Sequence, residues 1–551
     1  MSDSKRVLIV GGVAGGASCA ARLRRLDESC EIILFERGPY VSFANCGLPY
    51  YVGNVIKKEK DLLVTSAEQF QHRFKIDIRT ENEVTAIDRQ RREVEVKERN
   101  TGRLYRERYD ALVLSPGASA IRPPLPGIDL PGIHILRTIP DSNRIKQWIE
   151  ERNPRRAVVV GGGFIGLEMA ENLVNLGLKV TIIEMLPQLM PLLDAEMSEP
   201  IVTHLETKRV NIELGDAVAA FEAAEDGSLM VKTASGATHP ADLVILSVGV
   251  KPETGLAKAA GLEIGELGGI RVDDSLRTSD PRIWAVGDAV EVRDFITGQW
   301  CLAPLAGPAS RQGRMAADVI CGRNMKFRGV QGTTICCCAG ISVGMTGASE
   351  KSLRAAGITD YEKIYLHPGS HVSYYPGAKR IQMKLIFSTK DGRVLGAQAV
   401  GEKGVDKRID VFAMAIQKQA TVFDLEQAEL CYAPQFGAAK DPVNIAGMIA
   451  ANVLRGDLPL ADWAELESSS AFLLDVRTPE EVARDAIEGA ANIPVDELRD
   501  RCGELPKDRE VWVYCAVGER SYLATRLLLQ KGYRVRDLPG GIVTYWGYYP
   551  L

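Results

Sequence analysis

The stretch Arg6-Val-Leu-Ile-Val10-Gly-Gly-Val-Ala-Gly-Gly16 decides the fold of this chain. Its apolar run has the length of a buried strand, the glycines form a turn, and the helical pattern of Ala17–Leu26 follows. Ala157-Val-Val-Val160 and the predicted helix Gly166–Leu176 repeat this arrangement about 150 residues later. Because strand, glycine turn and helix in this order are typical of parallel sheets, we predict two doubly wound α/β domains.

Each glycine turn has the features of a dinucleotide site. The first departs from G-x-G-x-x-G because Val13 takes the second glycine position, whereas Gly161-Gly-Gly163-Phe-Ile-Gly166 is intact. An acidic residue, Glu36 or Glu184, ends the next strand in each case. Backbone amides at a helix N-terminus bind pyrophosphate, and such a carboxylate accepts from ribose hydroxyls. The Glu184 carboxylate would repel a 2′-phosphate, so we expect NADH rather than NADPH; the alternative for either turn is a tight βα turn without a ligand.

A later segment resembles a known cofactor motif. Thr278-Ser-Asp-Pro-Arg-Ile-Trp-Ala-Val-Gly287-Asp288 is similar to the second FAD motif of the flavoprotein disulfide reductases, in which the aspartate binds the ribityl chain. Leu114-Ser-Pro-Gly117 stands where that family has its domain-crossing turn. The resemblance covers residues 5 to about 325 and implies that the first turn holds FAD and the second NADH. The expected cofactor-binding residues are Gly11, Gly12, Val13, Ala14, Gly15, Gly16, Glu36, Arg37, Gly117, Gly161, Gly163, Gly166, Glu184, Gly287 and Asp288.

The segment Ser42-Phe-Ala-Asn-Cys46-Gly-Leu-Pro49 carries the candidate redox residue. Family members with a flavin-facing disulfide have two cysteines separated by four residues, but here Val41 and Tyr51 stand at those positions. We therefore interpret Cys46 as a single redox thiol that reacts as its thiolate, favoured by a helix that begins near it. Two chemistries stay open: a sulfenic acid cycle, as in NADH oxidases and peroxidases, or a mixed disulfide with a small thiol.

This segment closely resembles coenzyme A-disulfide reductase and NADH-dependent persulfide reductase. The resemblance implies that CoA contacts the residues Ser18, Arg22, Arg25, Ser42 and Asn45. Arg22 and Arg25 share one helix face, as a fork for phosphates requires; the alternative is an ordinary solvated face shared with Arg24.

Two tyrosines are implicated by the same resemblance. Tyr374 and Tyr432 lie in segments similar to the dimerisation domain of that family, where tyrosines reach from one subunit into the active site of the other. A phenol can donate a proton to a leaving thiolate and stay uncharged at neutral pH. We therefore expect a homodimer in which Tyr374 and Tyr432 are catalytic.

The C-terminal part resembles a rhodanese. Asp475-Val-Arg477, Gly489-Ala-Ala-Asn-Ile-Pro494 and Cys515-Ala-Val-Gly-Glu-Arg520-Ser521 match that family in order and spacing, whereas Asp485-Ala486 stands where it commonly has Gly-His. Four residues separate Cys515 from Arg520; phosphatases on the same scaffold have five, so the spacing favours sulfur transfer. A loop of successive amides suits a Cys515 persulfide, with added charge from Arg520. The alternatives are an inactive copy or a module that only binds a sulfur-transfer partner.

The expected architecture is α/β, with two Rossmann-like domains for FAD and NADH, an α+β dimerisation domain and a C-terminal α/β rhodanese domain. The expected boundaries are 1–117 with 250–325 for FAD, 118–249 for NADH, 326–453 for dimerisation and 460–551 for the rhodanese.

The predicted function is FAD-dependent, NADH-driven reduction of CoA disulfide, CoA persulfide or polysulfide through Cys46, with sulfane-sulfur transfer by Cys515. The alternative is an NADH oxidase or peroxidase that cycles through a cysteine sulfenic acid and carries a sulfur-relay module.

Composition limits the classes of partner and the cellular location that we expect. A net charge of −5 gives no reason to expect nucleic acid, and no apolar run is long enough to span a bilayer. Residues 1–4 leave no room for a secretory signal before the first strand, and eleven cysteines in 551 residues are not a disulfide scaffold, so we expect a cytoplasmic protein. Cys336-Cys-Cys338 is interpreted as a buried strand rather than a metal site, because consecutive strand residues point to alternate faces. No metal is expected.

Overall fold

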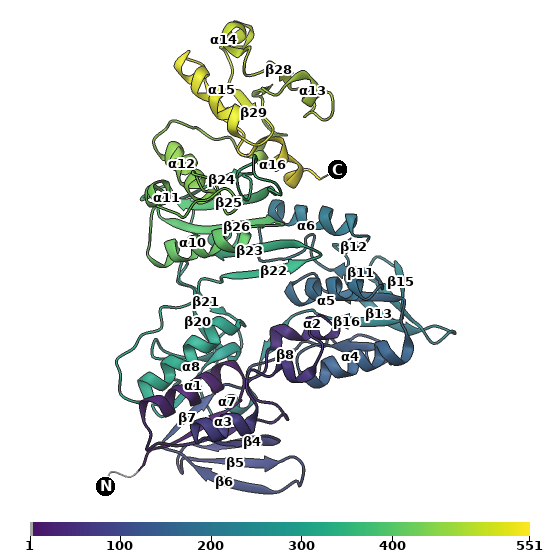
Figure 1. The fold of residues 1–551 in the computed structure, drawn as a ribbon, viewed down its shortest axis with the longest axis vertical. Coiled ribbons are helices and arrows are strands. Elements are labelled where there is room, and N and C mark those ends of the chain that lie inside the picture. The colour runs from purple at the N-terminus through teal and green to yellow at the C-terminus, as the bar shows by residue number, and fades with distance from the viewer. Residues whose placement is uncertain (1–3, 551) are drawn as a thin grey trace. The chain divides into compact units, whose positions relative to one another are not determined.

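The computed structural model describes residues 4–550. Residues 1–3, which belong to the predicted leaderless N-terminus, and Leu551, the predicted end of the rhodanese domain, lie outside the described residues. The chain forms two compact units, which are described separately (Figure 1). The first unit comprises the residues up to Met185 and Gly215–Val330, and the second comprises Leu186–Leu214 and the residues from Gln331 onward.

The first unit contains the two predicted parallel sheets. One has the strand order β19-β7-β1-β2-β3, with the bounds Ile283–Ala285, Ala111–Leu114, Arg6–Val10, Glu31–Phe35 and Asp77–Arg79. The other contains β11-β10-β16-β9, with the bounds Lys179–Glu184, Arg156–Val160, Leu243–Leu246 and Ile133–Ile135. Neighbouring strands pair in parallel throughout both series. The central strand β1 is fully buried at Val7–Ile9, as its unbroken apolar run predicts.

The helices after the two glycine turns begin earlier than predicted. Helix α1 spans Ala14–Leu26 and helix α5 spans Phe164–Asn175. Both helices begin inside the glycine motif, so Gly15, Gly16 and Gly166 lie in the first helical turns. Their missing side chains allow this, because a Cβ on Gly16 or Gly166 would collide with the backbone of the preceding turn. Antiparallel ribbons, β4–β6 (Asn82–Asp88, Glu93–Glu98, Leu104–Arg108) and β13–β15 (Val218–Ala223, Leu229–Thr233, Thr238–Ala241), complete the unit with helices α4 (Ile139–Arg152) and α8 (Ala306–Ile320).

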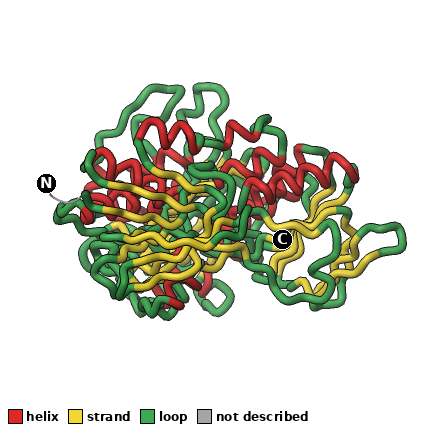
Figure 2. Tube along the Cα trace, turned by 90° about the horizontal axis from the view of Figure 1, so that it is seen from below, coloured by secondary structure: helices red, strands yellow, loops and turns green. Residues whose placement is uncertain are grey.

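The second unit begins with an antiparallel sheet that confirms the expected α+β domain. Its strand order is β22-β23-β26-β25-β24, with the bounds Thr334–Cys338, Ile341–Gly347, Val394–Gly401, Ile381–Ser388 and Tyr361–Leu366 (strands in yellow, Figure 2). Helix α10 (Val405–Gln417) packs on β23 and β26, and α11 (Val422–Gln427) packs on α12 (Pro442–Leu454). Cys336 and Cys338 are buried and Cys337 is half-buried, so the predicted alternation of the three cysteines on one strand is confirmed.

The C-terminal part is a parallel α/β domain. Its strands have the order β28-β27-β29-β30 and span Ala491–Asn492, Phe472–Asp475, Val511–Tyr514 and Val535–Asp537. The main helices are α13 (Pro479–Val482), α15 (Glu519–Gln530) and α16 (Gly541–Tyr548). Helix α15 begins directly after Gly518, whose φ of +100° ends the Cys515 loop. Among the described helices, none has both the length and the apolar character needed to cross a bilayer.

A buried ammonium group ties three segments of the second unit together. The Lys384 side chain is inaccessible, and its Nζ lies 2.8 Å from Asp194, 2.5 Å from Glu196 and 2.6 Å from Glu350. These carboxylates come from the segment around α6 (Ala195–Thr207) and from α9 (Glu350–Ala355). Burial alone would raise the pKa of Glu350, but Lys384 and Lys363 outweigh burial and hold it at about 2.

The contacts extend from this cluster into the C-terminal domain. Tyr365 OH lies 2.8 Å from Glu196 Oε1 and 2.7 Å from Tyr548 OH. Lys363 Nζ lies 3.1 Å from Glu350 and 2.9 Å from Asp462. The cluster therefore joins the antiparallel sheet to the first and last segments of the C-terminal domain.

We predict that Lys384→Met lowers the free energy of unfolding by about 3–5 kcal/mol, because it removes the cation that three buried carboxylates share. Among the described residues, only Glu350 of these three keeps other cationic ion-pair partners, such as Lys363. Thermal and urea unfolding of the variant and the parent at neutral pH measure the change. Lys390→Met, which removes a 72%-exposed lysine paired with Asp360, is the matched control and should change stability by less than about 1 kcal/mol. Equal effects of the two substitutions would contradict this account.

Candidate active site

The first glycine turn is shaped by close backbone contact. Gly11 has φ +96°, and a Cβ there would lie 2.0 Å from the carbonyl oxygen of Ser115, so only glycine fits. The Gly12 amide donates to Glu36 Oε2 at 2.8 Å, and the Gly38 amide donates to Glu36 Oε1 at 2.8 Å. Burial raises the pKa of Glu36 despite these two amides. The carboxylate thus lies at the turn, as the motif predicts, and is held by backbone amides.

A cavity of about 410 Å³ opens beside this turn and is lined by Gly11, Glu36, Arg37 and Glu253, among others. Helix α1 begins there at Ala14, and its N-cap residue Val13 offers no side-chain cap. Its first amides therefore remain available to an anion. These features fit the adenosine and pyrophosphate of FAD.

The second turn repeats the same construction. Gly161 has φ +107°, and a Cβ there would lie 2.5 Å from the carbonyl oxygen of Ser247. The Gly162 amide donates to Glu184 Oε2 at 2.7 Å, which matches the bond between Gly12 and Glu36. A Cβ on Gly163 would meet nothing within 4 Å, so the chain leaves space at this glycine. Both turns therefore have the form that a bound dinucleotide requires.

The predicted ribityl-binding aspartate lies close to the redox segment. Asp288, in the short turn Gly287–Ala289, accepts from Arg137 Nη2 at 2.7 Å. The Arg137 carbonyl oxygen in turn accepts from Asn45 Nδ2 at 3.2 Å. Gly117, with φ +76°, precedes Ala118, whose carbonyl accepts from Arg137 Nε at 2.9 Å. Arg137 thus connects the Gly117 turn, Asp288 and the residue before Cys46, although no sequence motif pointed to it.

Cys46 is exposed and lies in a 3₁₀ turn, Asn45–Gly47, that leads into the five-residue helix α2 (Leu48–Val52). Neighbouring protein atoms raise the pKa of Cys46, the Glu168 carboxylate raises it further, and the Arg137 guanidinium lowers it. Burial and the Glu168 carboxylate thus oppose the thiolate of Cys46, whereas Arg137 favours it.

Glu168 is held beside this segment by helix packing. It lies on α5, which packs against α2 so closely that a Cβ on Gly53 would lie 2.0 Å from Asn172. Tyr50 OH donates to Glu168 Oε1 at 3.4 Å. Burial raises the pKa of Glu168 to about 7, so this carboxyl group can hold or release a proton near neutral pH.

A second cavity, of about 520 Å³, has a basic lining. It contains the predicted residues Ser18, Arg25 and Ser42, and three arginines that the sequence analysis missed: Arg73, Arg311 and Arg314. Within residues 4–550, none of these four arginines has an acidic partner within ion-pair distance. Exposed guanidinium groups without acidic partners, drawn from three helices, are a suitable lining for phosphate groups.

The other predicted CoA residues lie elsewhere. Arg22 Nη2 pairs with the buried Asp318 at 2.8 Å, and Arg22 does not line the basic cavity. Arg24 is buried and donates to the carbonyl oxygens of Phe74 and Lys75, so the three arginines are not one solvated face. Asn45 binds the Arg137 carbonyl and is likewise absent from the cavity lining.

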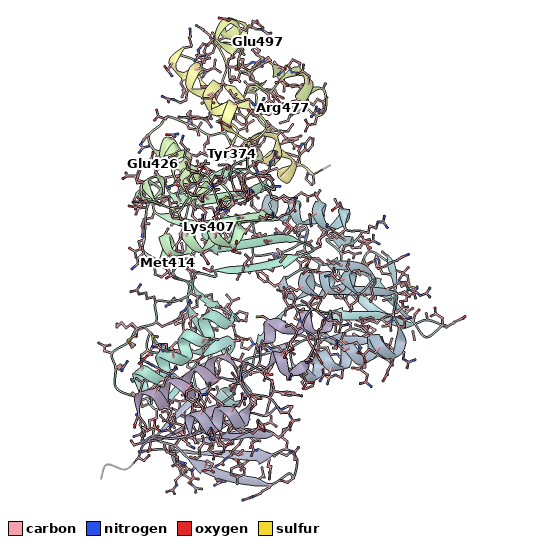
Figure 3. All side chains as sticks on the ribbon, viewed as in Figure 1. Tyr374, Lys407, Met414, Glu426, Arg477 and Glu497 are labelled. Carbon is pink, nitrogen blue, oxygen red and sulfur yellow. The ribbon has the colours of Figure 1, made fainter. Side chains whose placement is uncertain are left out.

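The two predicted catalytic tyrosines lie together on the second unit. Tyr374 OH and Tyr432 OH are 2.7 Å apart, and both side chains are exposed (Tyr374 is labelled in Figure 3). The hydrogen bond with Tyr374 raises the pKa of Tyr432. Two exposed phenols joined by a hydrogen bond can act together as a proton donor to a bound substrate.

The Cys515 loop has the predicted form. Cys515 follows β29 and is fully buried, and its Sγ accepts from the Gly518 amide at 3.1 Å. A Cβ on Gly541 would lie 2.3 Å from the Cys515 carbonyl oxygen, and the Ile542 amide donates to that oxygen at 2.8 Å. The loop is therefore fixed from both sides, with the sulfur at its base.

Both arginines of the predicted rhodanese motifs are paired with carboxylates. Arg520 donates from both of its terminal nitrogens to Glu481, at 2.6 and 2.7 Å. Buried Arg477 binds Asp475 at 2.7 Å and Asp485 at 2.8 Å (Arg477 is labelled in Figure 3). Asp485, which departs from the commonly observed glycine, thus has a structural role, and Trp546 Nε1 also donates to it at 3.3 Å.

Comparisons with known proteins agree with this geometry. Residues 5–313 match the model of the pyridine nucleotide-disulphide oxidoreductase family, residues 333–441 its dimerisation domain and residues 460–547 the rhodanese-like domain. The coenzyme A disulfide reductase of Staphylococcus haemolyticus is 34% identical over 444 residues, which cover 80% of this chain and 98% of that protein.

Two solved structures are similar along almost the whole chain. Reduced Bacillus anthracis CoADR-RHD is 45% identical, covers 99% of this chain and 98% of its own, and has a TM-score of 0.97. An NAD-dependent persulfide reductase from A. fulgidus is 38% identical, covers 98% and 100%, and has a TM-score of 0.91. The protein is therefore an enzyme of the pyridine nucleotide-disulphide oxidoreductase family, which uses FAD and NADH, and it carries a rhodanese-like domain after the dimerisation domain.

Proposed function

We propose that the protein reduces CoA disulfide or CoA persulfide through Cys46 and transfers sulfane sulfur through Cys515. The observation that carries the reductase part is the combination of the exposed Cys46 with a cavity lined by four arginines that have no acidic partner among residues 4–550. Ser42, four residues before Cys46 in the chain, lines this cavity, so an anion bound there would contact the segment that carries the thiol. CoA has this form, because its phosphates and its thiol lie at opposite ends of a flexible arm.

The Cys46 thiolate attacks one sulfur of CoA–S–S–CoA. A Cys46–S–S–CoA bond forms, the original S–S bond breaks, and CoA–S⁻ leaves with the electron pair. The Gly11–Gly16 turn, Glu36 and Asp288 would hold FAD, which when bound would supply the redox chemistry that passes two electrons from NADH to the mixed disulfide. NADH is assigned to the turn with Glu184.

Residues of the chain influence the ionisation of Cys46 and donate protons in this cycle. Glu168 disfavours a second negative charge at Cys46 once its own carboxyl group ionises near pH 7. The hydrogen-bonded Tyr374 and Tyr432 are assigned as proton donors to the leaving thiolate, reaching the Cys46 of a second copy in a homodimer. Ser18 and Arg25 would bind the nucleotide end of CoA with Arg73, Arg311 and Arg314, whereas Arg22 and Asn45 position the segments around it.

The boundaries of the four domains are proposed as predicted, since the cofactor turns, the antiparallel sheet and the Cys515 loop each fall inside one of them. A cytoplasmic location suits this assignment, because free thiols are maintained in a reducing compartment.

The oxidase alternative uses the same single thiol but gives the basic cavity no role, because oxygen and peroxide carry no phosphate. The experiment that separates the two functions is NADH consumption under argon, with and without CoA disulfide. The proposed function requires anaerobic turnover that depends on CoA disulfide and CoA thiol as the product. Consumption that needs oxygen and ignores CoA disulfide would establish the oxidase instead.

We predict that Cys46→Ser lowers kcat for CoA disulfide by on the order of a thousandfold or more, because an alcohol cannot form the mixed disulfide. Anaerobic NADH oxidation followed by absorbance measures this loss, and the flavin spectrum checks that cofactor content is unchanged. Cys431→Ser removes another exposed cysteine and is the matched control. Retention of CoA disulfide turnover by Cys46→Ser would refute the assignment.

We predict that Arg73→Ala or Arg314→Ala raises KM for CoA disulfide by about tenfold with a smaller change in kcat, because each removes a charged contact to phosphate. Steady-state kinetics at fixed NADH give both constants. Arg108→Ala, which removes a 79%-exposed arginine paired with Glu93, should leave both constants within about twofold. A KM that no cavity arginine influences would place CoA elsewhere.

We predict that Glu168→Gln lowers the pKa of Cys46, because it removes a negative charge that opposes the thiolate. The rate of Cys46 alkylation by iodoacetamide, followed against pH by peptide mass spectrometry, should rise at lower pH in the variant. Glu151→Gln, on the exposed side of α4, is the control. An unchanged or raised Cys46 pKa in Glu168→Gln would remove Glu168 from the site.

A further inference from the structure

The charge of Arg520 at the Cys515 loop is already neutralised. Glu481 binds both terminal nitrogens of the guanidinium at 2.6 and 2.7 Å, which is the bidentate geometry of a strong pair. Glu481 is itself positioned, because its Oε2 also accepts from the Thr478 amide at 3.0 Å in the capping box of α13. Arg520 and the Thr478 turn together hold the pKa of Glu481 at about 2, so the carboxylate is ionised at every physiological pH.

The remaining charges near the loop do not compensate. Arg477 forms ion pairs with both Asp475 and Asp485. The segments 475–485 and 515–521 contain three arginines and five carboxylates: Arg477, Arg484 and Arg520 against Asp475, Glu480, Glu481, Asp485 and Glu519. Glu480 and Glu519 are exposed. Thus these two segments carry net negative charge, and Arg520, which also interacts with the Cys515 sulfur, is already paired with Glu481.

Two classes of sulfur donor place very different charge at such a site. Transfer from thiosulfate to a thiolate, S–SO₃²⁻ + Cys–S⁻ → Cys–S–S⁻ + SO₃²⁻, collects three negative charges. Transfer from the protonated form of a persulfide, R–S–SH + Cys–S⁻ → Cys–S–SH + R–S⁻, collects one negative charge at the reacting sulfurs, and the ionised persulfide collects two. Like charges at contact distance are strongly unfavourable when water is partly excluded, as it is at the fully buried Cys515.

We infer that the sulfur donor of Cys515 is a persulfide of a small thiol rather than thiosulfate, and that Glu481 determines this specificity by occupying Arg520. The inference rests on the proposed sulfur transfer. The Cys515 thiolate attacks the terminal sulfur of R–S–SH. A bond forms between this sulfur and Cys515 Sγ, the S–S bond of the donor breaks, and R–S⁻ leaves with the electron pair. No oxidant or reductant is needed. Because Cys515 is fully buried, the donor must present a terminal sulfur, which excludes the internal sulfurs of a symmetric disulfide.

The specificity has the form of discrimination by repulsion. Glu481 makes no new contact with the preferred donor. Its pairing with Arg520 instead reduces the attraction between Arg520 and the thiosulfate dianion. Removing the Glu481 charge while keeping a hydrogen-bonding group should therefore release Arg520 for thiosulfate.

The test uses the full-length, flavin-loaded protein and two donors, thiosulfate and glutathione persulfide, with cyanide as acceptor and thiocyanate as the measured product. The unmodified protein should show kcat/KM for glutathione persulfide at least about a hundredfold above that for thiosulfate. Glu481→Gln should raise kcat/KM for thiosulfate by about tenfold, mainly through a lower KM, and make that constant more sensitive to salt.

Glu480→Gln is the matched control, because it removes the same charge from the neighbouring exposed residue and should leave the ratio of the two donors unchanged within about twofold. Glu481→Asp, which keeps the charge, should keep thiosulfate poor. Equal use of the two donors by the unmodified protein, or no change of their ratio in Glu481→Gln, would overturn the inference. Inactivity of Cys515 with both donors would instead remove the proposed sulfur transfer.

Discussion

The construction of the reductase part depends on one interaction that occurs twice: a glutamate at the end of a parallel strand accepts the amide of the second residue of a glycine turn. Gly12 donates to Glu36 and Gly162 donates to Glu184 at nearly equal distances. This bond fixes the turn so that the following helix points its uncapped amides into the space where a pyrophosphate lies. A dinucleotide site results in which backbone, rather than flexible side chains, sets the geometry.

Arginine pairing separates the binding sites from the structural ones. Arg22 and Arg477 are held by buried carboxylates and act on the fold, whereas Arg73 and Arg314 face a cavity without acidic partners. A guanidinium always carries its charge, so what distinguishes these residues is only whether the fold supplies an anion to each. Arg520 combines both features, because it is paired with the carboxylate of Glu481 and also lies at the Cys515 loop.

The second unit is organised around an internal cation instead. Lys384 lies among three carboxylates whose oxygens are close enough together to hold a metal ion, and its ammonium group takes that position. The neighbouring tyrosines continue the network to Tyr548 in the last helix. Such a junction connects the rhodanese-like domain to the antiparallel sheet within the second unit.

The sequence by itself determined the strands and helices of the parallel sheets, both glycine turns with their acids, the strand of three cysteines and the Cys515 loop, because each of these elements is specified by residues close together in the chain. Only the tertiary structure decided which arginines are available: Asp318 is nearly 300 residues from Arg22, and Arg73 and Arg314 meet from separate helices. It also decided that Glu481 neutralises Arg520, and that Glu168 lies near Cys46. Local patterns specify elements and turns, whereas the charge at a site is the sum over segments that only folding brings together.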